Sequence, residues 1–191
     1  MLITLYQRND FTAQIYFVKI FVFDNRDCEV DNVKKIKKTN AARILDNLKI
    51  SYEVKTYEVD EEDLSAIHVA ETMGFDIKNI FKTLVARGDK NGIIMAVING
   101  ADELDFKALA KASGNKSVEM IHLKELQPLT GYIRGGCSPL GAKKAYPVYL
   151  DSKAMEQETI SISAGVRGEQ LILSPTDLVK AANATVADIV R

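Results

Sequence analysis

Apolar residues follow a helical spacing in several segments of the chain. Ala41, Ile44, Leu45 and Leu48 occupy positions i, i+3, i+4 and i+7, and Thr39 just before them is a residue type favoured as an N-cap. This pattern predicts a helix that buries one face. Residues typical of helix starts and ends predict three more helices, over residues 65–73, over residues 104–112 and from residue 175 onward.

Other segments alternate between apolar and polar residues, as half-buried strands do. The alternation predicts short strands over residues 53–59, 80–86, 93–98, 117–121, 131–134, 146–150, 159–163 and 170–173. The segment between the second and third of these is rich in glycine, aspartate and asparagine, so those two strands are expected to form an antiparallel hairpin. Many short strands with few helices favour an α+β (mixed α/β) fold, with a curved, partly closed mixed β-sheet and surrounding helices.

Composition limits the number of domains and the kinds of partner. The chain has 191 residues, of which 47% are hydrophobic, enough for one well-formed core. Residues 1–36 differ from the rest, because aromatic residues crowd there and a charged run follows. We therefore expect an N-terminal extension over 1–36, either a two-stranded appendage or a segment without a functional role, and one domain over 37–191. The net charge of −1 provides no general attraction for nucleic acid, so DNA is not expected as a partner and any RNA contact must be local.

Several classes of chemistry are disfavoured by the motifs that the chain lacks. It contains no phosphate-binding or dinucleotide-binding glycine motif and no zinc-protease motif. Cys28 and Cys137 show no metal-ligand spacing with the two histidines, so we expect no metal and no cofactor. The apolar stretch over residues 11–23 is short for a membrane span and is interrupted by Lys19, so a cytoplasmic protein without a membrane partner is expected. A serine triad that uses Ser138 with His68 or His122 stays open as an alternative.

Lys82 is an unusual residue in its predicted strand. It shares a strand face with Ile80 and Leu84, while Phe81 and Thr83 point the other way, so both faces of this strand are largely apolar. One interpretation is a lysine that protects an edge strand from aggregation. The other is a cation in a pocket wall, where a low dielectric strengthens its attraction for a phosphate or an oxyanion.

Two glycine-containing segments are further candidates for a binding site. Residues 131–141 contain four glycines and Pro139, which suits a tightly shaped loop with accessible backbone N–H groups. Residues 159–163 place hydroxyl side chains on one strand face, and Arg167 follows in the next turn. These segments are read either as a polar pocket with a phosphate-binding arginine or as ordinary turns beside a solvated strand.

Taken together, four segments of the chain resemble the motifs of one family. They are residues 39–43 (TNAAR), 81–85 (FKTLV), 135–141 (GGCSPLG) and 163–168 (SAGVRG). In this order they resemble the YbaK/EbsC family, bacterial cysteinyl-tRNA(Pro) deacylases related to the editing domain inserted in prolyl-tRNA synthetases. The resemblance covers about residues 37–191, and the family's members lack a counterpart of the first thirty-odd residues.

The resemblance implies a set of site residues. Lys82 corresponds to the family's essential lysine. Gly135 and Pro139 stand at the ends of the family's GxxxP substrate loop, whose backbone orients the aminoacyl group. The resemblance therefore implies that Lys82 and Gly135 are the catalytic residues. The expected substrate-binding residues are Tyr57, Thr83, Gly136, Pro139, Ser163, Arg167 and Gly168.

The resemblance also implies an activity, which is the removal of cysteine from mischarged tRNA(Pro). A synthetase pocket separates cysteine from proline poorly because their side chains are similar in size, so a second, hydrolytic site is useful. In relatives the substrate's own thiol is thought to attack its carbonyl, which makes the reaction formally that of a lyase and leaves Cys137 without a role. The expected partners are the acceptor end of tRNA(Pro) and prolyl-tRNA synthetase. Two alternatives remain, an editor of another small aminoacyl-tRNA such as Ala-tRNA and a non-catalytic module that binds tRNA or a synthetase.

Overall fold

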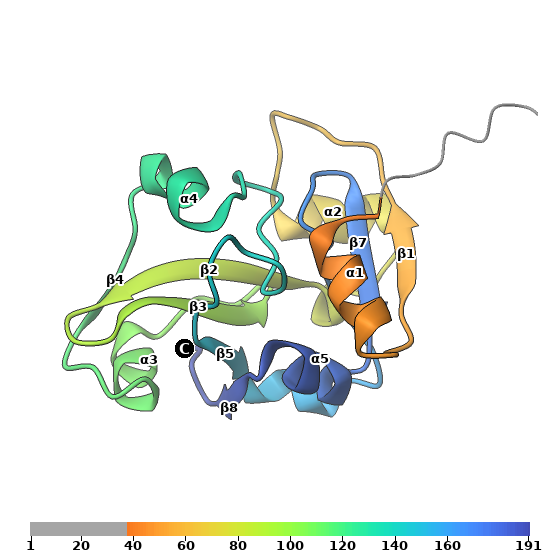
Figure 1. Ribbon diagram of the computed structural model, residues 1–191. Helices are drawn as coiled ribbons and strands as arrows, with labels where there is room; N and C mark the ends of the chain where they lie inside the picture. Colours follow the sequence, from red (N-terminus) through yellow and green to blue (C-terminus); the bar gives the residue numbers. More distant parts are fainter. Residues whose placement is uncertain (1–37) are drawn as a thin grey trace, which may run out of the picture. The chain divides into compact units, whose positions relative to one another are not determined.

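The computed structural model describes residues 38–191, which contain five α-helices, two 3₁₀ helices and eight strands (Figure 1). In chain order these are α1 (Asn40–Asn47), β1 (Glu53–Thr56), α2 (Ala66–Met73), η1 (Ile77–Asn79), β2 (Phe81–Gly88), β3 (Gly92–Asn99), α3 (Phe106–Ala112), β4 (Val118–Met120), α4 (Leu123–Thr130), β5 (Val148–Asp151), η2 (Ser152–Glu156), β6 (Ile160–Ser163), β7 (Glu169–Leu173), α5 (Pro175–Ala182) and β8 (Thr185–Ala187).

The strands form two sheets. The smaller has the order β1-β7-β6 and is antiparallel, whereas the larger has the order β4-β2-β3-β5-β8 and combines antiparallel with parallel pairs. A parallel bridge between Ile80 and Ser161 connects the start of β2 to β6. The mixed α+β class is therefore confirmed, but the strands divide into two sheets that are not closed into a barrel.

The hairpin of β2 and β3 separates two parts of the hydrophobic core. Phe81 and Val85 face the larger part, which also contains buried residues of α1, β6 and α5. Ala86 and Ile98 face the smaller part, where they meet Leu109 of α3. In Figure 1, α3 and α4 accordingly lie on opposite sides of this hairpin. Apolar residues on both faces of β2 are thus explained by burial on both faces.

The helix starts expected from the sequence are present. The Thr39 hydroxyl accepts the Ala42 N–H at 3.2 Å at the start of α1, and the Ser65 hydroxyl accepts the His68 N–H at 3.2 Å at the start of α2. Ser174 accepts an N–H of α5 in the same way. Each such cap satisfies a backbone donor that the helix itself leaves unpaired, and contributes about 1 kcal/mol.

Two segments differ from the prediction. The strand expected over 131–134 is wrong, because α4 occupies 123–130 and ends at Gly131, whose φ of 85° breaks the extended conformation. Helix α4 was not expected because Pro128 lies inside it and removes a helical N–H. It is stabilised at its start by Glu125, whose carboxylate accepts the His122 N–H at 3.1 Å. Strand β8 was also missed, since its three residues pair only with β5.

Some expectations concern residues outside the described part. The N-terminal extension over 1–36, including Cys28 and Lys19, lies before residue 38, where the description begins. From residue 38 to the end of the chain, no helix has both the length and the apolar character that a membrane span requires.

Candidate active site

The glycine loop, defined here as residues 131–141, packs closely against the turn that follows β6. Gly135 has a φ of 83°, and a Cβ atom there would lie 3.3 Å from the methyl groups of Leu64 and 3.5 Å from Nε of Arg167. A Cβ atom at Gly136 would lie 3.3 Å from the backbone nitrogen of Arg167. A Cβ atom would be tightly packed at both positions, and Gly135 also has a positive φ, so glycine is favoured at Gly136 by space and at Gly135 by space and conformation.

Arg167 fixes the loop from the other side. Its Nε donates to the carbonyl oxygen of Arg134 at 2.9 Å, and one terminal nitrogen approaches Glu61 at 3.3 Å. Its side chain is 26% exposed, whereas that of Glu61 is 81% exposed. The ion pair with Glu61 is therefore a surface pair of small energetic value, and the guanidinium group remains accessible to an anion.

The same turn brings Tyr57 and Ser163 to the loop. The backbone N–H of Tyr57 donates to the carbonyl of Gly168 at 2.9 Å, and a Cβ atom at Gly168 would lie 3.3 Å from the carbonyl oxygen of Tyr57. The Ser163 hydroxyl accepts the N–H of Gly165 at 3.2 Å. Six expected site residues therefore gather around one turn, namely Tyr57, Gly135, Gly136, Ser163, Arg167 and Gly168.

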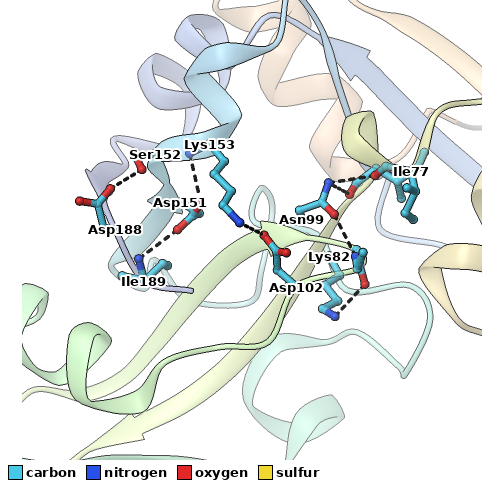
Figure 2. Close-up of polar contacts among 12 residues, drawn as sticks. Ile77, Lys82, Asn99, Asp102, Asp151, Ser152, Lys153, Asp188 and Ile189 are labelled. Atoms are coloured by element: carbon cyan, nitrogen blue, oxygen red, sulfur yellow. Dashed lines mark hydrogen bonds and ion pairs between the residues drawn. The ribbon is translucent and has the colours of Figure 1, made fainter. Parts of the chain in front are cut away.

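Lys82 lies on β2, two residues beyond the Ile80–Ser161 bridge that joins the two sheets, as Ser163 does on β6. Its Nζ donates to the carbonyl oxygen of Gly100 at 2.9 Å (Figure 2). Strand β4 pairs only with Ala86–Gly88 of β2, so Lys82 is paired with β3 alone and the interpretation as an edge-strand lysine stays open.

Burial alters the acidity of Lys82. Partial loss of solvent lowers the pKa of its ammonium group, and the nearby carboxylates of Asp102 and Glu103 oppose this shift. The Asp102 carboxylate is itself paired with Lys153 at 2.8 Å (Figure 2). Lys82 thus donates to a neutral carbonyl rather than to a carboxylate, which leaves its charge available to a substrate.

Two expected binding residues lie away from this group. Thr83 shares the face of Phe81, opposite to Lys82, and its buried Oγ1 has no hydrogen-bond partner within the described residues. Pro139 lines a separate cavity of about 230 Å³ between α1, α5 and the glycine loop. Among the described residues, no hydrogen bond joins the side chain of Thr83 to the turn after β6, and Pro139 lines a cavity to which that turn does not contribute.

The nucleophile alternatives find little support in the geometry. Burial raises the pKa of the Cys137 thiol to about 12, so this thiol is neutral at physiological pH. The Ser138 side chain is fully buried and its oxygen accepts the Leu140 N–H at 3.3 Å. Among the described hydrogen bonds, neither His68, which faces Thr72, nor His122 reaches Ser138. A serine triad is therefore not assembled.

Sequence reasoning missed three residues around the site. Glu61 and Leu64 come from the segment before α2, where the acidic run over 60–63 was the available signal. Gly100 ends the β2–β3 hairpin, and a Cβ atom there would lie 2.5 Å from that of Ala66. Nothing in the sequence pattern ties these positions to Lys82, because the contacts arise from tertiary packing.

Comparison with known proteins supports an editing domain. The family model described as "Aminoacyl-tRNA editing domain" matches residues 61–181, which include all expected site residues except Tyr57. The chain belongs to this family. Within the editing-domain family, EbsC of Enterococcus faecalis is 49% identical over 156 residues, which cover 82% of this chain and 95% of EbsC. EbsC carries the provisional name Cys-tRNA(Pro)/Cys-tRNA(Cys) deacylase.

Two further matches concern parts of larger proteins and the fold. A proline–tRNA ligase of Shouchella clausii is 31% identical over 99 residues, which cover 52% of this editing domain's chain and 17% of the ligase. A crystal structure described provisionally as a trans-editing enzyme for prolyl tRNA synthetase superposes with a TM-score of 0.67. It covers 80% of this chain and 97% of its own at 23% identity, which shows a shared fold.

Proposed function

We propose that this editing domain is a free-standing deacylase that removes cysteine from mischarged tRNA(Pro). The observation that carries the proposal is the 49% identity with EbsC over nearly the whole length of that protein. The glycine loop and the accessible arginine at the turn after β6, and the partly buried Lys82 on β2, support it, since such groups can bind the ester and the phosphates at the end of a tRNA.

The loop is proposed to bind the reacting carbonyl. The backbone N–H groups of Gly135 and Cys137 donate to no acceptor within residues 38–191, whereas that of Gly136 is used by the carbonyl of Ile133. Free N–H groups held in a rigid loop stabilise an oxyanion without reorganisation. Lys82 and Arg167 then hold the ribose and phosphate of the tRNA end, so that positioning supplies much of the rate acceleration.

The bond-breaking step is proposed to use the substrate's thiol. Its sulfur forms a bond to the ester carbonyl carbon, the bond from that carbon to the ribose oxygen breaks, and the thiol proton ends on the released ribose hydroxyl. The products are a cyclic thiolactone and uncharged tRNA. This step requires no nucleophile from the protein, in agreement with the neutral thiol of Cys137 and the buried hydroxyl of Ser138.

The first experiment is single-turnover deacylation of Cys-tRNA(Pro), Ala-tRNA(Pro) and Ser-tRNA by the wild type and by Lys82→Ala. We expect rapid release of cysteine alone, and a loss of about 100-fold or more in the variant, as for removal of one group that stabilises a transition state. Lys78→Ala serves as a matched control, because Lys78 pairs with Asp76 on the surface.

Other outcomes separate the alternatives. Faster release of alanine than of cysteine indicates an editor of another small aminoacyl-tRNA, and binding without any release indicates a non-catalytic module. Cys137→Ala should leave the rate unchanged. S-methylcysteine has no free thiol. Its release from tRNA would contradict the cyclisation step while leaving the deacylase assignment intact.

We further propose that the editing domain spans residues 37–191, acts in the cytoplasm and binds prolyl-tRNA synthetase. The family match within 61–181 and the relatedness to proline–tRNA ligases support these assignments. With a net charge of −1 the chain has little general attraction for RNA, so a synthetase that holds the tRNA would raise the effective concentration. Equal selectivity for tRNA(Pro) with and without prolyl-tRNA synthetase would contradict the partnership.

A further inference from the structure

A groove lies on the face of β2 that carries Lys82 and Leu84, and no residue of the glycine loop lines it. Its volume is about 370 Å³, within the range of small-molecule sites. Its walls combine four apolar side chains with charged groups of both signs. They are formed by Lys82, Leu84, Asp102, Glu103, Leu104, Phe106, Met120 and Arg191.

Arg191 is held at the groove by the residues around it. Its backbone N–H donates to the carbonyl of Glu103 at 3.1 Å, and the N–H of Asp105 donates to the carbonyl of Ile189 at 2.8 Å. The buried carboxylate of Asp151 accepts the Ile189 N–H at 3.0 Å (Figure 2). This part of the groove wall is therefore fixed by a buried charge-assisted hydrogen bond as well as by backbone pairing.

We propose that this groove seats the terminal nucleoside of the tRNA acceptor end. The inference rests on the proposed deacylase function, because Lys82 belongs to both the groove and the proposed reacting centre. An ester held near Lys82 must have its ribose and base within a few ångströms, and the groove is the space that opens there.

The chemistry of the walls fits a nucleoside. Phe106 and Met120 offer an aromatic face and a polarisable thioether, on which a base can stack whatever its sequence context. Asp102 and Glu103 offer carboxylates, which commonly accept ribose hydroxyl groups. Lys82 and Arg191 contribute positive charges beside these carboxylates, which suits a nucleoside with an adjacent phosphate.

Binding is measured with a trinucleotide that ends in 2-aminopurine, cytidine-cytidine-2-aminopurine, whose fluorescence is quenched on stacking. The protein has no tryptophan to interfere. We expect saturable quenching by the full-length chain, weakened about tenfold by Phe106→Ala and by Met120→Ala, as for the loss of one stacking partner. Met155→Ala is the matched control, because Met155 and Met120 are both 41% exposed and Met155 lies outside the groove.

The outcomes are separable from those of the deacylation assay. Phe106 also packs against the smaller core, so Met120→Ala is the variant that tests the groove without a folding defect. The inference is overturned if no quenching is seen, or if Met120→Ala and Met155→Ala change the quenching equally. This holds even if the protein deacylates Cys-tRNA(Pro). Specific quenching by a protein that releases no amino acid supports the groove and contradicts the deacylase assignment.

Discussion

The glycine loop and the surroundings of Lys82 prepare polar groups for a ligand in opposite ways. The loop offers backbone N–H groups, and its shape relies on a positive φ at Gly135 and on close packing, because a Cβ atom at Gly135 or Gly136 would lie 3.3 Å from its nearest neighbour. Lys82 stands on a regular strand, where the backbone accepts any residue and the side chain alone carries the function. Ligand binding through backbone N–H groups can therefore be lost by substitution of a glycine, although glycine has no side-chain functional group.

This difference affects how each part responds to substitution. In the loop, a change moves several N–H groups together, because the peptide planes are linked. On β2, a change at Lys82 removes one charge and leaves the hydrogen-bonded ladder with β3 in place. Both changes are expected to reduce activity, but only the first should also disturb the positions of Leu64 and Arg167.

The largest expected effect in the loop is that of Gly135→Ala. The new methyl group meets Leu64 at 3.3 Å and stands at a φ of 83°, so the loop must shift. A displacement of about 1 Å can cost on the order of 100-fold in rate. Single-turnover deacylation measures it. Gly74→Ala is the control, since Gly74 has a φ of 65° with no neighbouring atom within 4 Å and carries only the backbone strain. Equal losses in both variants would mean that strain rather than loop position matters.

A smaller effect is expected from Tyr132→Phe. The Tyr132 hydroxyl donates to the Leu140 carbonyl at 2.5 Å and so ties the two ends of the glycine loop together. Its loss leaves a buried carbonyl unpaired, which costs about 1–3 kcal/mol in the free energy of unfolding. Urea unfolding measures this cost. Tyr146→Phe removes a comparable bond to Leu129 outside the loop, and it should lower stability without slowing deacylation.

The same tyrosine gives a pH dependence with a defined sign. Burial, and the neighbouring Cys137, raise the pKa of Tyr132 from its ordinary value of 10.0 to about 12. The unfolded chain therefore releases this proton first as the pH rises, and stability is lost between about pH 10 and pH 12. The slope in this window should be shallower in Tyr132→Phe, and an unchanged slope would contradict the assignment.

The smallest expected effect is that of Glu61→Gln. Glu61 competes with a phosphate for Arg167, but it is largely exposed and weakly held. Its removal should lower the KM for Cys-tRNA(Pro) about twofold at low salt, with the gain reduced at high salt. Glu62→Gln makes the same change in charge next to it. If both variants shift the KM equally, the effect is one of general charge and not of Arg167.

Much of this arrangement follows from local sequence patterns. The caps at Thr39, Ser65 and Ser174 and the alternation of the β2–β3 hairpin were readable because each depends on neighbouring residues. The conflict at Pro128 shows the limit, since a proline usually ends a helix and here lies within one. Strand β8 depends on a partner 36 residues earlier in the chain, which no local pattern can indicate.

The residues of the candidate site could be proposed from the sequence, but their arrangement in space could not. Lys82, the glycine loop and Arg167 were found from unusual residue types and from the family resemblance. The placement of Thr83 on the opposite face from Lys82 follows from simple alternation, which conflicts with a shared pocket wall. Glu61 and Gly100 were missed, because their importance arises from packing between segments that are distant in the sequence.

The bridge between Ile80 and Ser161 has a consequence for how the molecule loses activity. It is the paired connection between a three-stranded and a five-stranded sheet, and the proposed site lies across it. The spacing of Lys82 and Ser163 therefore exists only while both sheets are intact in the same molecule. Local opening of either sheet separates the two halves of the site. The lifetime of the active conformation is therefore set by the sheet that opens at the lower free energy, and not by global unfolding.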